Sequence, residues 1–78
     1  MKVFFELEVG FLNRSFARTQ LQNSKAKLEH WYPGCRVLLT EEKDWFESKF
    51  YFEANNIPDT EHEFLKGWLD TLKRISSL

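Results

Sequence analysis

The amino-acid sequence predicts an α+β domain in which an antiparallel sheet of three to four strands carries two helices on one face. Apolar and polar residues alternate with a period of two over residues 2–9 and 45–54, which is typical of strands. Over residues 65–75, apolar residues recur at helical spacing. The 78 residues suffice for one domain, residues 1–78, and the 17% aromatic content supplies large side chains for its core.

The first strand covers residues 2–9 and places its apolar residues on one side. After a turn, residues 14–21 fit two interpretations. As a strand, this segment forms a hairpin with the first strand and gives the order ββαββα. As a helix, it joins the next element in one long helix and gives βαββα. We favour the strand, because a helical stripe through Phe16 and Thr19 continues into the polar Asn23.

A short helix and a hairpin are expected next. Asn and Ser at 23–24 can cap the start of the helix, and Pro-Gly at 33–34 ends it. Residues 36–40 form a β-branched and leucine-rich strand, and residues 41–44 form a charged corner. The aromatic segment 45–54 then returns as the second strand of an antiparallel hairpin.

A final helix is predicted over residues 61–76. Acidic residues lie near its start and basic residues near its end, which suits the helix dipole. Gly67 falls off the apolar stripe, where it weakens the helix. The stripe that we expect to pack on the sheet consists of Leu65, Trp68, Leu69, Leu72 and Ile75.

The segment 45–54 is aromatic on both faces of the expected strand. The set that can point into the core is Phe46, Ser48, Phe50, Phe52 and Ala54. The opposite face also carries large apolar side chains that the core does not need, and such surfaces often mark binding sites. We therefore interpret the open face of the sheet as a partner-binding surface made of Phe4, Leu38, Trp45, Lys49 and Tyr51.

Three explanations compete for this face. It is a solvated surface braced by cross-strand charge pairs, an interface with a protein partner or a second copy of the chain, or a platform on which bases of a nucleic acid stack. Carboxylates on the same face repel phosphates, so nucleic acid is the least favoured. The concentration of basic residues that would serve an alternative nucleic-acid-binding role is Arg14, Arg18, Lys25 and Lys27.

Composition and motifs give no sign of catalysis. With the single cysteine Cys35, an internal disulfide is impossible, and the two histidines are not spaced as zinc ligands. The sequence has no phosphate-binding loop and no GxSxG motif. Acidic residues interrupt the apolar residues near the start of the sequence, no segment has the roughly 20 apolar residues of a membrane span, and the formal net charge is only −1, so we expect no signal peptide and no membrane span. We therefore expect no enzyme, cofactor, metal or membrane partner, and a cytoplasmic location.

The order of elements resembles that of small phage and prophage regulators. The stretch from Leu28 to Pro33, followed by a hairpin and an amphipathic last helix, is similar to the DNA-damage-inducible inhibitors of RecA over roughly the last fifty residues. That family carries a dense acidic ridge on its final helix, where this chain has Lys66, Lys73 and Arg74. In size and strand-rich build, the chain also resembles phage-encoded anti-CRISPR inhibitors.

These features together lead us to expect a non-enzymatic protein-interaction domain, a small phage or mobile-element regulator that binds and blocks a protein target. The alternative is a small nucleic-acid-binding regulator that uses the basic residues.

Overall fold

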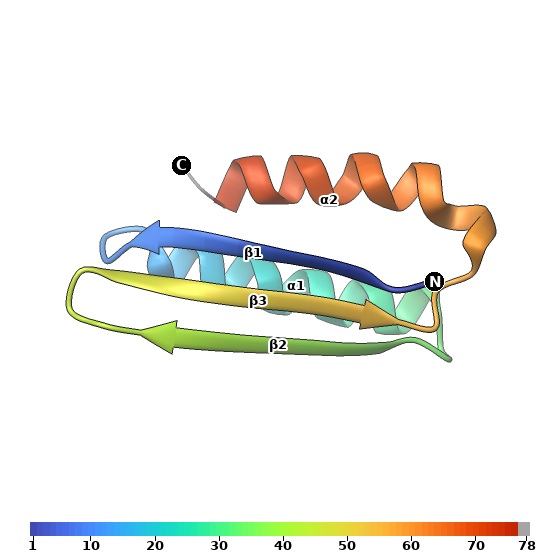
Figure 1. Cartoon of the computed structure of the whole chain (residues 1–78), viewed down its shortest axis with the longest axis horizontal. Helices are drawn as coiled ribbons and strands as arrows, with labels where there is room; N and C mark the ends of the chain where they lie inside the picture. The colour runs from blue at the N-terminus through green and yellow to red at the C-terminus, as the bar shows by residue number, and fades with distance from the viewer. Residues whose placement is uncertain (77–78) are drawn as a thin grey trace.

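The computed structural model describes residues 1–76 and contains a three-stranded sheet and two long helices (Figure 1). A short 3-10 turn leads into the second helix. The elements in chain order are β1 Val3–Gly10, α1 Arg14–Trp31, β2 Arg36–Lys43, β3 Glu47–Asn55, the 3-10 turn Asp59–Glu61 and α2 His62–Ser76. The predicted α+β class with an antiparallel sheet and two helices is confirmed.

The last strand in the chain occupies the centre of the sheet. The strand order is β1-β3-β2, and β3 runs antiparallel to both neighbours. Val3 pairs with Ala54 on one side of β3, and Val37 pairs with the same residue on the other side. Both β1 and β2 are therefore edge strands of the sheet.

The prediction of a strand over residues 14–21 is wrong, because α1 runs unbroken from Arg14 to Trp31. The order is βαββα, as in the alternative interpretation. The buried stripe of the helix differs from the one through Phe16 and Thr19, and Phe16 is exposed. Small side chains in this stripe let the helix lie close to the sheet, and its buried members are Ala17, Leu21, Ser24 and Leu28.

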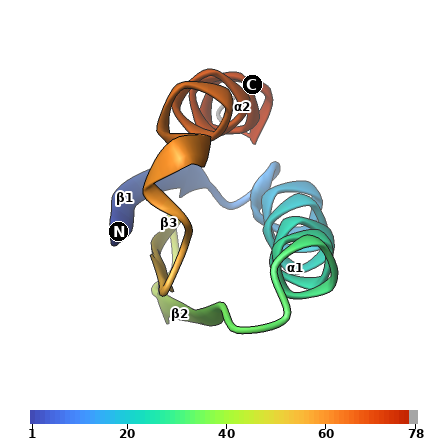
Figure 2. The same ribbon diagram turned by 90° about the vertical axis from the view of Figure 1, so that its right-hand side faces the viewer.

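One hydrophobic core joins the sheet to both helices. In the view along the strands, α1 covers one face of the sheet, and α2 lies beside β1 and extends that cover (Figure 2). The buried stripe of α2 consists of Leu65, Leu69 and Leu72. Trp68 is half-buried, with its ring 5.4 Å from that of Trp31, so the aromatic rings close the seam between the helices. Ile75, expected on the stripe, is exposed.

The hairpin between β2 and β3 turns later than predicted. The first of these strands continues to Lys43, and the turn consists of residues 44–46 rather than 41–44. Phe46, expected in the core, is therefore in the turn and 78% exposed. The remaining members of the expected core set are buried, as predicted: Ser48, Phe50, Phe52 and Ala54.

Candidate protein-binding surface

The face of the sheet away from the helices carries most of the predicted partner-binding residues. Phe4, Leu38, Lys49 and Tyr51 have the strand parity opposite to that of the buried residues, so they share this open face. The register places Phe4 and Leu38 on either side of Glu53, and both apolar side chains are about half exposed.

Charged pairs brace the middle of the open face. The Lys49 ammonium lies 3.5 Å from a Glu6 carboxylate oxygen and 3.8 Å from one of Glu8, and 5.6 Å from the centre of the Tyr51 ring. Attraction to Glu6 is the largest cause that raises the pKa of Lys49. The Tyr51 hydroxyl donates to Glu42 over 3.3 Å. These contacts fit the solvated, charge-braced explanation for this part of the face.

Trp45 does not lie on the open face. It is in the turn of the β2–β3 hairpin, where it is 88% exposed beside the exposed Phe46. The turn after β1 adds Phe11, which is 53% exposed, and Leu12, which is 81% exposed. The Phe11 N–H donates to the Phe46 carbonyl over 2.8 Å, so the two turns are joined. We call the residues Phe11, Leu12, Trp45 and Phe46 the apolar tip.

Hydrogen bonds fix the backbone conformation of the β2–β3 turn, which carries Trp45 and Phe46 of the apolar tip. One carboxylate oxygen of Asp44 accepts the N–H groups of Phe46 and Glu47, both at 2.8 Å. These two amide bonds lower the pKa of Asp44, the bond from Glu47 being the larger cause. The Arg14 guanidinium donates to the Asp44 carbonyl over 2.9 Å and ties α1 to the turn. The exposed rings therefore project from a fixed turn rather than from a loose loop.

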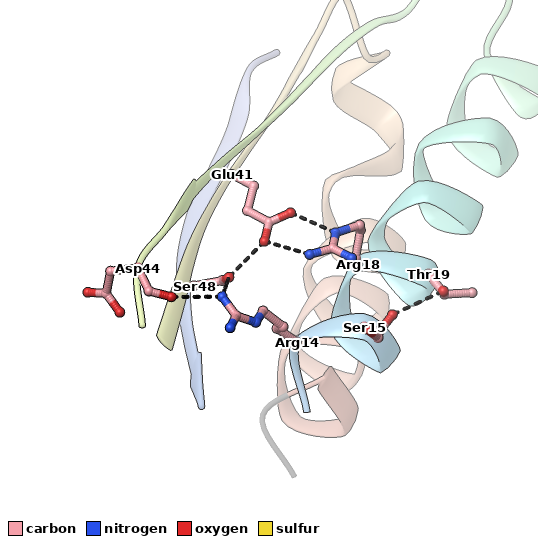
Figure 3. Close-up of polar contacts among 7 residues, drawn as sticks. All are labelled: Arg14, Ser15, Arg18, Thr19, Glu41, Asp44 and Ser48. Carbon is pink, nitrogen blue, oxygen red and sulfur yellow. Dashed lines mark hydrogen bonds and ion pairs between the residues drawn. The ribbon is translucent and has the colours of Figure 1, made fainter. Parts of the chain in front are cut away.

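Arg14 and Arg18, two of the predicted nucleic-acid-binding residues, face the sheet (Figure 3). Arg18 donates to both carboxylate oxygens of Glu41, over 2.7 and 2.9 Å. The Ser48 hydroxyl donates to the same carboxylate over 2.7 Å. This arrangement, with Arg18 as its largest cause, lowers the pKa of Glu41 from 4.5 to about 2. Both arginines thus join α1 to the hairpin.

Lys25 and Lys27 lie about two turns or more beyond Arg18 along α1. Lys27 is exposed and Lys25 is half-buried. The four basic residues therefore do not form one open patch, because the sheet-facing arginines are engaged with Glu41 and the hairpin.

Of the four residues of the apolar tip, only Trp45 was predicted to lie in a binding surface, and Phe46 was predicted to lie in the core. Phe11 and Leu12 were assigned only to a turn, yet turns are dominated by Gly, Pro, Asn, Asp and Ser. Two large apolar residues directly after Gly10 were the available signal. Their proximity to Trp45 could not be inferred, since it depends on β1 pairing with β3 rather than with a neighbouring segment.

Other candidate sites are weaker within the part of the chain that the structure describes. The Cys35 thiol is buried, and burial raises its pKa, so it stays protonated and a poor nucleophile at neutral pH. Among residues 1–76, no group of three or more His, Cys, Asp and Glu side chains could hold a metal ion. No helix in this range is long and apolar enough to cross a membrane.

No protein-family model matches the chain, and comparisons with curated proteins and with solved structures give no significant match.

Proposed function

We propose that this chain is a non-enzymatic protein-interaction domain that binds and blocks a protein target through its apolar tip, in the manner of a small phage or mobile-element inhibitor. The observation that carries the proposal is that two turns, joined by a backbone hydrogen bond at one end of the sheet, together expose four large apolar side chains. Large apolar patches on a small protein commonly mark interaction sites.

The turn geometry favours tight binding by these side chains. Asp44 and Arg14 already fix the backbone that carries Trp45 and Phe46. A fixed backbone loses little further freedom when it docks, so more of the contact energy appears as affinity. Aromatic side chains dominate the binding energy at protein interfaces, and Trp45 is the most exposed of the large apolar residues in the described chain.

The charge around the apolar tip favours a protein over a nucleic acid. A shallow hollow of about 280 Å³ beside the tip is lined by Glu42, Lys43, Asp44, Glu47 and Lys49. Three of these five residues are acidic, and Lys49 is already paired with Glu6 and Glu8. This environment repels phosphate groups and suits a target whose apolar pocket is bordered by basic residues.

The test compares capture of proteins from a lysate of the native host by the tagged chain and by two variants. Trp45→Ser with Phe46→Ser removes the aromatic rings of the tip and should abolish capture of the specific target. Leu38→Ser with Tyr51→Ser removes apolar surface from the open face and should leave capture within about twofold of the wild type.

The alternatives make distinct predictions in the same experiment. Loss of capture only with the open-face variant would move the site to the sheet. Capture that disappears after nuclease treatment, together with retention on heparin that weakens steeply with salt, would instead support the nucleic-acid-binding regulator. Circular dichroism of each variant separates lost binding from lost folding.

A further inference from the structure

The outer edge of β1 pairs with no other strand in the described part of the chain. A groove of about 280 Å³ separates the first half of this strand from α2. Consecutive residues 1–5 form one wall of the groove, so the wall includes the backbone edge and not only one face of the strand. The other wall comes from α2 and consists of His62, Lys66, Leu69 and Asp70.

The backbone groups that face this edge follow from the register. Gly10 pairs with Glu47, so Phe11 is opposite Phe46, and the Phe11 N–H donates to the Phe46 carbonyl. In an antiparallel pair, residues that bond to the partner alternate with residues that point away from it. The residues whose N–H and C=O groups point to the open edge are therefore Lys2, Phe4, Glu6 and Glu8.

The sequence of this edge is complementary to itself. When two copies of β1 pair antiparallel about Phe4, each Phe4 faces its counterpart, and Lys2 of either copy faces Glu6 of the other. Opposite charges and paired aromatic rings both stabilise such cross-strand neighbours. On the other face of the strand, Val3 faces Phe5, so apolar residues meet there too.

Other registers are less complementary than this one. Pairing about Glu6 sets Glu6 opposite Glu6, and pairing about Lys2 sets Lys2 opposite Lys2, so like charges face each other. Pairing about Phe5 sets Lys2 opposite Glu8, but it also sets each Phe4 ring opposite the charged Glu6. The register about Phe4 also extends existing ion pairs, because Lys2 lies 3.0 Å from Glu53 and Glu6 lies 3.5 Å from Lys49 within one chain.

We propose that β1 pairs with β1 of a second copy of this chain, about Phe4, and joins two three-stranded sheets into one continuous sheet across a two-fold axis. The half-exposed Phe4 becomes covered by its counterpart. The apolar tip lies beyond the other end of β1, so an antiparallel dimer carries its two tips at opposite ends. If the tip binds a target as proposed above, the dimer is bivalent.

The test measures oligomeric state by sedimentation equilibrium of the full chain over a range of concentrations. The wild type should be dimeric at high concentration. Lys2→Glu and Glu6→Lys each place like charges opposite one another and should weaken dimerisation at least tenfold. An equimolar mixture of these two variants should form a heterodimer, because every charged position then faces its opposite. Glu29→Lys on the exposed side of α1 is the control for a change of charge and should leave the dimer intact.

A variant that changes the backbone of β1 tests the dimer independently of charge. Phe4→Pro removes an N–H that points to the open edge and not to β3, so the sheet should still fold while dimerisation is lost. A wild type that stays monomeric at every concentration would overturn the proposal, as would a mixture of the two charge variants that stays monomeric. Neither result affects the proposed role of the apolar tip, which the capture experiment tests separately. A monomer whose capture of the target is lost with Phe4→Pro would indicate that a strand of another protein occupies the edge.

Discussion

Replacing Glu41 with glutamine should destabilise the fold in a manner that depends on pH. Glu41 lies on the helix-facing side of β2, where its carboxylate accepts both Arg18 bonds and the Ser48 hydroxyl. Glutamine keeps the size of the side chain but has one oxygen acceptor and no charge. The variant therefore leaves part of the Arg18 guanidinium without its partner.

The expected loss follows from the lowered pKa of Glu41. A shift from 4.5 to about 2 corresponds to roughly 3–4 kcal/mol if one pKa unit is worth about 1.4 kcal/mol. The side chains of Arg18 and Glu41 remain 33% and 20% exposed, so solvent screens part of this energy. We expect Glu41→Gln to lower the free energy of unfolding by about 1–2 kcal/mol at pH 7.

The pH dependence has a definite sign. A carboxyl whose folded pKa is depressed stabilises the fold above its unfolded pKa and loses that contribution as pH falls through the folded value. The difference between wild type and Glu41→Gln should therefore be complete above pH 4.5 and shrink as the pH falls toward 2. Urea unfolding at several pH values measures this difference.

A matched control separates this local contact from a general effect of charge. Glu29→Gln makes the same chemical change at an exposed position of α1 and should change the free energy of unfolding by less than about 0.5 kcal/mol. Equal losses for the two variants, or a Glu41→Gln deficit that persists unchanged at pH 2, would refute the reasoning.

Three further predictions concern single residues. Gly67→Ala should raise the free energy of unfolding by about 0.5–1 kcal/mol, because Gly67 is inside α2, has no positive φ, and an added Cβ would meet no heavy atom within 4 Å apart from its own helix backbone and its chain neighbours. Thermal unfolding measures this change. Asn56→Ala should cost about 1 kcal/mol, because Asn56 has a φ of 62°, whereas Asn56→Gly should cost less in the same assay. Cys35 should react with a thiol reagent at neutral pH far more slowly in the folded than in the urea-unfolded chain, and equal rates would contradict its burial.

The strands and the last helix were predictable from local sequence, because the spacing of apolar residues within each segment indicates its secondary structure. The alternation in β1 and the stripe through Leu65 and Leu69 are readable without knowledge of any partner. The long helix α1 was misjudged because its buried stripe uses the small or polar residues Ala17 and Ser24, which carry little hydrophobic signal. Their burial depends on the close approach of helix and sheet, which is a tertiary effect.

The candidate site was predicted in part for a similar reason. Parity along the strands correctly places Phe4, Leu38 and Tyr51 on one face. The position of the hairpin turn depends on contacts between distant segments: Arg18 holds Glu41 within β2, and Arg14 holds Asp44 in the turn. These contacts shift the turn to residues 44–46 and move Trp45 from the sheet to the apolar tip.

The central position of β3 also determines when the chain can fold during synthesis. Val3 pairs with Ala54, so β1 has no strand to bond with until some fifty more residues have been made. At about 5–20 residues per second, this delay lasts roughly 3–10 seconds. During this interval the nascent chain exposes the apolar residues of β1. Once β3 has been made, the β2–β3 hairpin can close locally, because its two strands are neighbours in the chain. Pairing β1 with β3 is therefore the step with the largest entropic cost of loop closure, and we expect it to limit the folding rate. We also expect chaperones to act before this step.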